Sequence, residues 1–184
     1  MCENVRHIYD MQEQNIWTIG HSTHSFKVFI AMLKSFHIEL VADIRSFPGS
    51  KRYPHFNKEA LVISLPLNEI EYVHLRGLGG RRKTNLDSHN TGWRLDAFRG
   101  YADYMETDMF KKAIEELECL GGKKRVAFMC AEAVWWRCHR SLVSDYLKQQ
   151  GWKVLHIMGK GKSEEHPYTS PARIVGNQLV YSKE

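Results

Sequence analysis

Residues able to transfer protons, attack as nucleophiles or bind anions follow each of five apolar runs in this sequence. They are Gly20-His21-Ser22, Asp43 with Arg45, the segment from His74 to Arg82, Cys130-Ala131-Glu132, and His156. Carboxylates and imidazoles serve as general acids and bases, thiolates as nucleophiles, and guanidinium groups as anion ligands. One such residue alone indicates little. Five together favour a functional site.

The fourth of these segments has the most specific chemistry. It joins an expected strand to a helix whose first turn should hold Cys138, His139 and Arg140. The backbone N–H groups and dipole of a helix start favour an anion, and Arg140 would strengthen that preference. We therefore predict an anion-binding turn here. Cys130, at its mouth, is either a thiolate nucleophile of lowered pKa or a small buried residue that ends a strand.

Two acids and one histidine are candidates for proton transfer. Asp43 and Glu132 would both end central strands, facing the expected crevice. Asp43 fits equally well as a salt-bridge partner of Arg45 or Arg140. His21 is a base, an anion ligand, or a loop residue bonded to the backbone. The candidate catalytic residues are Asp43, Glu132, His21 and Cys130.

The excess of positive charge is confined to two loops. Residues 44–58 and 72–86 hold 8 of the 26 Lys and Arg and no acid, so the other 154 residues carry 18 bases against 21 acids, a net charge of −3. Phe47, Tyr53, Phe56 and the pair Trp135-Trp136 add planar side chains near these bases. Bases that bind phosphate beside rings that stack on nucleobases are typical of single-strand binding, although charged loops often contact solvent alone. The expected substrate-binding residues are Gly20, Ser22, Arg45, Ser46, His55, Arg81, Arg82, Trp136, Cys138, His139 and Arg140.

Neither a metal nor an organic cofactor is predicted from these motifs. Structural zinc sites usually pair ligands two to four residues apart, and the sequence has no C-x-x-C or H-x-x-x-H. The pair His21 and His24 is a weak signal by itself. Gly79-Gly80-Arg81-Arg82 matches neither the dinucleotide-binding nor the Walker fingerprint.

The elements that would position these residues alternate regularly. Strands are expected over 16–20, 39–44, 70–75, 125–129 and 152–157, and helical spacing follows Ser25, Asn57, Gly100 and Arg140. This alternation predicts a three-layer α/β/α fold with a mostly parallel five-stranded sheet. A C-terminal β-hairpin is expected around Gly176-Asn177. The carboxyl ends of parallel strands share one edge, where ligands bind.

Length and composition fit one ordinary domain. With 184 residues and 43% hydrophobic residues, we expect a single α/β domain over 16–184 after a flexible arm over 1–15. No apolar run approaches the roughly 20 residues that cross a bilayer. Four cysteines do not indicate a disulfide framework, and no charged-then-apolar leader opens the chain. We expect a cytoplasmic protein.

Four ordered motifs resemble the domain of unknown function 488 family. They are Thr18 to Ser22, Asp43 to Pro48, Leu78 to Arg82, and Cys130 to Glu132 with Cys138 to Arg140, and the likeness runs from about Ile16 to Ile157. The resemblance implies a compact α/β domain whose polar motif residues gather at one site. It implies no particular reaction.

The functional expectation combines the basic loops with the polar strand ends. We predict an enzyme that acts on a phosphate-bearing substrate, nucleic acid or a nucleotide, by hydrolysis or group transfer. The alternative is a non-catalytic nucleic-acid-binding module that uses the same basic and aromatic loops.

Overall fold

The computed structural model describes residues 14–183 and is built around one six-stranded sheet. The strand order is β3-β2-β4-β1-β5-β6. The bounds are β1 Asn15–Gly20, β2 Leu40–Asp43, β3 Glu71–His74, β4 Val126–Cys130, β5 Lys153–Gly159 and β6 Lys162–Glu165. The predicted arm over residues 1–15 lies outside the described residues except for its last two, and Asn15 already belongs to β1.

The mostly parallel sheet is confirmed, with one strand more than predicted. Strands β1 to β5 pair in parallel, and β6 is antiparallel to β5. Every residue of β4 is buried, as is typical of a central strand covered on both faces. Every residue of β6 is exposed, and its sequence Lys-Ser-Glu-Glu has no apolar alternation. That edge strand therefore carries no strand signal in its sequence.

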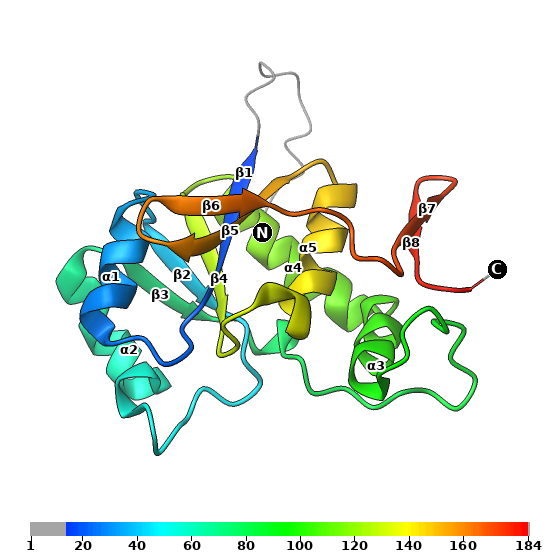
Figure 1. The fold of residues 1–184 in the computed structure, drawn as a ribbon, viewed down its shortest axis with the longest axis horizontal. Helices are drawn as coiled ribbons and strands as arrows, with labels where there is room; N and C mark the ends of the chain where they lie inside the picture. The colour runs from blue at the N-terminus through cyan, green and yellow to red at the C-terminus, as the bar shows by residue number, and fades with distance from the viewer. Residues whose placement is uncertain (1–13, 184) are drawn as a thin grey trace.

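Helices cover both faces of the sheet (Figure 1). Helices α1 Phe26–Lys34 and α2 Lys58–Ser64 pack on one face, whereas α3 Asp96–Met105, α4 Asp108–Gly121 and α5 Arg140–Gln149 pack on the other. Alternate strand residues separate the two cores: Val126 and Phe128 join the second group, and Ala127 and Met129 join the first. Because successive strand side chains point to opposite faces, the predicted three-layer fold is confirmed.

The segment between β3 and β4 differs in detail from the prediction. The helical spacing that follows Gly100 continues to Leu117 without a break, but the structure has two helices, because Thr107 starts a new one. Its side chain accepts a hydrogen bond from the N–H of Phe110, which is the usual cap of a helix start. The first of the two helices, α3, begins at Asp96, ahead of the helical spacing expected after Gly100.

The C-terminal hairpin agrees with its sequence signal. Strands β7 Arg173–Val175 and β8 Gln178–Val180 pair antiparallel around Gly176 and Asn177. Both turn residues have positive φ, 54° and 65°, as a two-residue type I′ turn requires.

The topology leaves a crevice between the ends of β2 and β4. These neighbouring strands lead to opposite faces of the sheet, because β2 continues into α2 and β4 continues into α5. Their loops therefore separate at the carboxyl edge, which is where open α/β sheets bind ligands. In Figure 1 the loops after β1, β2 and β4 lie along the lower edge of the sheet.

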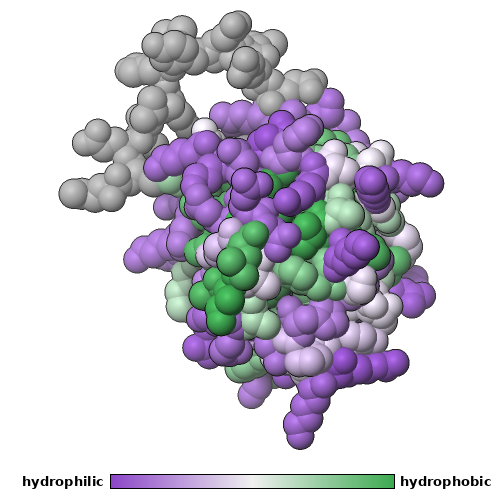
Figure 2. Space-filling view, turned by 90° about the vertical axis from the view of Figure 1, so that its left-hand side faces the viewer, coloured by the Kyte–Doolittle hydropathy of each residue, from purple (hydrophilic) through white to green (hydrophobic). Residues whose placement is uncertain are grey.

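The side of the molecule that carries α1 and α2 exposes several apolar side chains. Figure 2 shows hydrophobic residues gathered among hydrophilic ones there. The large exposed apolar residues of these two helices are Val28, Val62 and Ile63, and Leu67 is exposed in the 3₁₀ turn that follows α2. Among residues 14–183, no helix has both the length and the apolar character needed to cross a membrane.

Candidate functional site

A cavity of about 290 Å³ opens between the loops after β2 and β4. Seven predicted site residues line it: Arg45, Ser46, Arg81, Cys130, Glu132, Cys138 and His139. They come from three loops that are far apart in sequence, which brings the second, third and fourth polar segments together. The remaining lining residues are Phe47, Gly80, Ala97, Phe98, Ala131 and Arg137.

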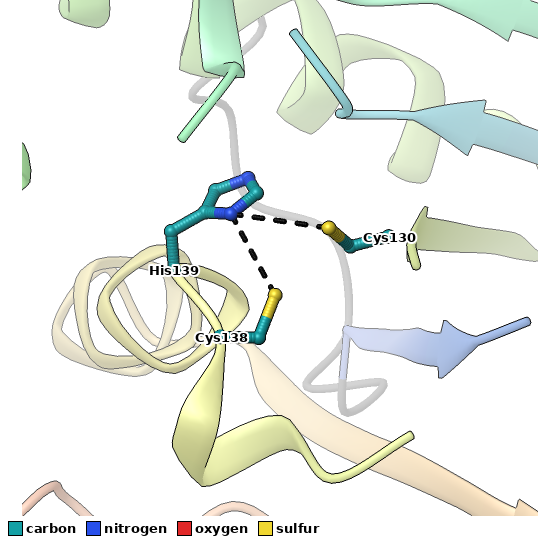
Figure 3. A group of neighbouring side chains, drawn as sticks. All are labelled: Cys130, Cys138 and His139. Atoms are coloured by element: carbon teal, nitrogen blue, oxygen red, sulfur yellow. Dashed lines mark hydrogen bonds between the residues drawn. The ribbon is translucent and has the colours of Figure 1, made fainter. Parts of the chain in front are cut away.

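Two cysteines and a histidine form a tight cluster in this cavity (Figure 3). Cys130 ends β4, and a single 3₁₀ turn over Trp135–Arg137 returns the chain so that Cys138 lies beside it. The ligand atoms of Cys130, Cys138 and His139 all lie within 4.8 Å of one another. Both cysteines are buried free thiols.

The orientation of the His139 ring is fixed from its far side. Its Nε2 lies 3.1 Å from the carbonyl oxygen of Ile44, so Nε2 carries a proton and donates it there. Nδ1 then faces the sulfurs, 3.6 Å from Cys138 and 3.9 Å from Cys130. Gly80 packs against the ring so closely that a β-carbon there would lie 2.4 Å from Nδ1.

The two thiols differ in acidity. A hydrogen bond to Cys138, followed by burial, raises the pKa of Cys130 well above its ordinary value. Burial also opposes ionisation of Cys138, but the hydrogen bond from Cys130 and interactions with His139 and Arg140 lower its pKa well below the ordinary value. The thiolate therefore belongs to Cys138, and Cys130 is its hydrogen-bond donor. The nucleophilic role of Cys130 stays a prediction.

Asp43 and Arg45 form a buried ion pair under the cavity. Arg45 donates from Nε to one carboxylate oxygen at 2.8 Å and from Nη2 to the other at 2.6 Å. Tyr72 donates its hydroxyl to the same carboxylate at 2.8 Å, and Arg45 also donates to the carbonyl of Phe56. Of the two roles considered for Asp43, the salt-bridge role is the one its contacts match.

His21 lies behind this pair and does not line the cavity. Its ring stacks on Phe56 with centroids 4.3 Å apart, Nδ1 donates to the carbonyl of Ser22 at 3.0 Å, and Nε2 accepts from Arg45 at 3.0 Å. Burial, and then the nearby Arg45 charge, lowers its pKa to about 4. His21 is neutral at pH 7, and both ring nitrogens are occupied.

Arg140 and Arg82, predicted to bind substrate, are held by the protein itself. Arg140 is 1% exposed and donates to Thr18 Oγ1 at 2.8 Å and to the carbonyl of Glu132 at 2.7 Å. Arg82 donates to the carbonyls of Gly79 and Gly77, and its guanidinium lies over the Tyr104 ring, 3.5 Å from the centroid. Each guanidinium thereby fixes a loop that borders the cavity.

Four other predicted substrate-binding residues also lie outside the cavity lining. Gly20 lets the loop after β4 approach β1, since a β-carbon there would lie 1.8 Å from the carbonyl oxygen of Glu132. Ser22 adopts a positive φ of 47°, and His55 Nε2 donates to the carbonyl of His24. Trp136 is half exposed.

The groups left for a ligand are at the rim. Glu132, Arg81 and Arg137 are exposed, and no described carboxylate forms an ion pair with either arginine. The guanidinium of Arg81 lies over the Phe47 ring, 5.3 Å from its centroid. The backbone N–H of Arg81 donates to Ser46 Oγ.

Sequence reasoning missed Arg137, Ala97 and Phe98 among the residues that line the cavity. Arg137 had a usable signal, because it stands directly before Cys138 in a loop already chosen for its chemistry. Ala97 and Phe98 lie in the first turn of α3, before Gly100, where the helical spacing was expected to begin. Their approach to the cavity depends on how α3 packs, so the sequence carries no signal for it.

Comparison with known proteins gives one match. No curated protein and no solved structure matches the sequence. A family model for a domain of unknown function, DUF488, matches residues 25–147, which include three of the four motifs in full. The chain therefore belongs to the DUF488 family.

Proposed function

We propose that this protein is an enzyme that binds a phosphate-bearing substrate, a nucleotide or single-stranded nucleic acid, and catalyses hydrolysis or group transfer. The observation that carries the proposal is the cavity between β2 and β4, which has ionisable thiols and an imidazole on its floor and uncommitted charges at its rim. Perturbed ionisable groups inside a concave site are characteristic of active sites.

Two arginines supply the positive charge for the phosphate. Arg81 comes from the loop after β3 and Arg137 from the turn before α5, so they approach the cavity from different segments. Both guanidinium groups are exposed and keep their donors for a ligand. Charge-assisted, bidentate hydrogen bonds make arginine well suited to phosphate.

Aromatic side chains beside these arginines favour a nucleotide over a bare phosphate. Phe47 is 62% exposed and Phe98 is half-buried, and both line the cavity. Exposed rings next to cations are the usual platforms for stacked bases. A volume of about 290 Å³ lies at the small end of ligand sites, which matches one nucleotide unit rather than a duplex.

Glu132 is the proposed general acid or base. Its side chain is exposed at the cavity rim, and its backbone carbonyl is fixed by Arg140. A carboxylate within reach of a bound phosphate can activate water or protonate a leaving group. For a covalent route, Cys138 suits the nucleophile better than Cys130, because its pKa is the lowered one.

Turnover of defined substrates tests this proposal. We expect the purified protein to release phosphate or nucleotide from mononucleotides or short single-stranded oligonucleotides. Glu132→Gln should lower kcat by about 100-fold or more while leaving substrate affinity nearly unchanged. Glu116→Gln, an exposed residue of α4, is the matched control and should keep full activity.

Two results would decide against catalysis. Equal turnover by Glu132→Gln and the parent protein would exclude Glu132 as the general acid or base. Salt-dependent binding of oligonucleotides with no turnover of any of them would favour the alternative, a non-catalytic nucleic-acid-binding module.

A further inference from the structure

We propose that Cys130, Cys138 and His139 form a zinc site with three protein ligands and a fourth position open to the cavity. The spacing of these ligands along the chain does not match the usual structural zinc motifs, so the sequence predicts no metal. The fold supplies the proximity that the spacing lacks, since the turn over Trp135–Arg137 brings Cys138 back to Cys130.

The distances fit tetrahedral coordination. With Zn–S bonds of about 2.3 Å and Zn–N bonds of about 2.0–2.1 Å, two tetrahedral ligands S and N stand about 3.6 Å apart. The structure places Nδ1 of His139 3.6 Å from the sulfur of Cys138 and 3.9 Å from that of Cys130. Figure 3 shows both sulfurs turned toward the same ring nitrogen. Binding would need only small side-chain shifts.

The surroundings also have the features of a metal site. The Nε2–H of His139 donates to the carbonyl of Ile44, which turns Nδ1 toward the sulfurs as the atom that would bind the metal. Metal-bound histidines usually donate their other N–H in this way. Thiolate and imidazole ligands select zinc over magnesium or calcium, which prefer oxygen. Two thiolates would neutralise Zn²⁺, so the buried cluster would carry no net charge.

The fourth position is what separates this site from a structural one. Structural zinc sites have four protein ligands, whereas catalytic sites have three and bind water or substrate at the fourth position. Cys130, Cys138 and His139 all line the cavity, so a ligand there can reach the metal. Glu132 lines the same cavity, as do Arg81 and Arg137.

The zinc site goes beyond the proposed function and does not depend on it. Metal occupancy makes both sulfurs ligands, so the nucleophile would then be a zinc-bound water rather than Cys138. The phosphate-binding role of the rim arginines is the same in either case.

Metal binding by the purified full chain, kept reduced, tests the site directly. We expect one zinc per chain by elemental analysis and a rise in Tm when zinc is added to metal-free protein. Cobalt substitution should give thiolate charge-transfer bands and the visible bands of tetrahedral Co²⁺. Cys138→Ser and His139→Gln should each lower zinc affinity at least tenfold, while His89→Gln, an exposed histidine outside the cluster, should not.

Gly80→Ala provides a variant that keeps all three ligands. Its new β-carbon would lie 2.4 Å from Nδ1 of His139, so it should weaken zinc binding by displacing the ring. Circular dichroism of each variant reports whether the fold is intact.

Three results would overturn the proposal. They are no zinc uptake by the reduced parent protein, unchanged affinity in Cys138→Ser and His139→Gln, or a cobalt spectrum without thiolate bands. None of these results depends on turnover, so the metal site and the proposed function can fail separately.

Discussion

Replacing Asp43 with Asn should destabilise the protein strongly, because it leaves the buried Arg45 cation without its carboxylate. The side chain of Asp43 is fully buried and that of Arg45 is 7% exposed. Asn is nearly isosteric with Asp, so the substitution removes the charge and one acceptor while creating no cavity.

The magnitude follows from the hydrogen bonds that depend on the carboxylate. Asp43 accepts four: from the N–H, Nε and Nη2 of Arg45 and from the hydroxyl of Tyr72. An Asn amide would keep one oxygen for the first two and turn an NH₂ group toward the other two donors. Breaking a buried ion pair by removing one partner costs about 3–5 kcal/mol. We expect a loss of that size in the free energy of unfolding.

Urea unfolding at pH 7, followed by circular dichroism, measures this loss. The control is Glu69→Gln, which removes a surface pair with Lys34 at 4.0 Å and should cost no more than about 1 kcal/mol. A change below about 1 kcal/mol for Asp43→Asn would refute the reasoning. It would mean that Arg45 finds other acceptors or that water reaches the pair.

Two further predictions concern backbone contact and pH. Gly20→Ala should cost about 1–3 kcal/mol in urea unfolding, because its β-carbon would overlap the carbonyl of Glu132, whereas Gly49→Ala, with no atom within 4 Å, should be nearly neutral. Burial is the main cause that lowers the pKa of His21 to about 4 and that of His156 to about 2. The unfolded chain therefore binds these protons at higher pH than the folded chain does. The free energy of unfolding is highest above about pH 6.5 and decreases as the pH drops, by about 3 kcal/mol at pH 4 for His21 alone. Unfolding curves between pH 7 and pH 4 that show no such fall, or a His21→Gln variant with the same fall, would contradict this assignment.

The sequence predicts the framework because the framework is made of strong local signals. A few neighbouring residues are enough to determine the conformation of each such segment. Examples are the buried run 126–129, the helix cap at Ser25 and the Gly176-Asn177 turn. Strand β6 has no such signal, because it forms only by pairing with β5. At Thr107 the sequence does have a capping residue, but the apolar spacing continues through it and hides the break between α3 and α4.

The candidate site is predicted less completely because the type of a residue does not determine which way its side chain points. Arg45, Arg82 and Arg140 have the chemistry of anion ligands, yet carboxylate and carbonyl acceptors within the fold bind all three. Arg137 has the same chemistry and faces the cavity. The cluster of two cysteines and a histidine depends on a turn that brings positions 130 and 138 together. Rules based on the spacing of metal ligands along the sequence do not detect ligands that only the fold brings together.

Salt dependence of single-strand binding tests the central claim, that the rim of the β2–β4 cavity binds phosphate. For single strands, the logarithm of affinity falls with the logarithm of salt concentration by about 0.7 for each neutralised phosphate. The double variant Arg81→Gln/Arg137→Gln should bind a short single-stranded oligonucleotide more weakly, with a slope smaller by about 1.4. The control pair Lys112→Gln/Lys123→Gln removes the same charge from exposed positions outside the cavity and should keep the parent slope. If Arg81→Gln/Arg137→Gln had the same affinity and slope as Lys112→Gln/Lys123→Gln, phosphate binding at the rim would be contradicted.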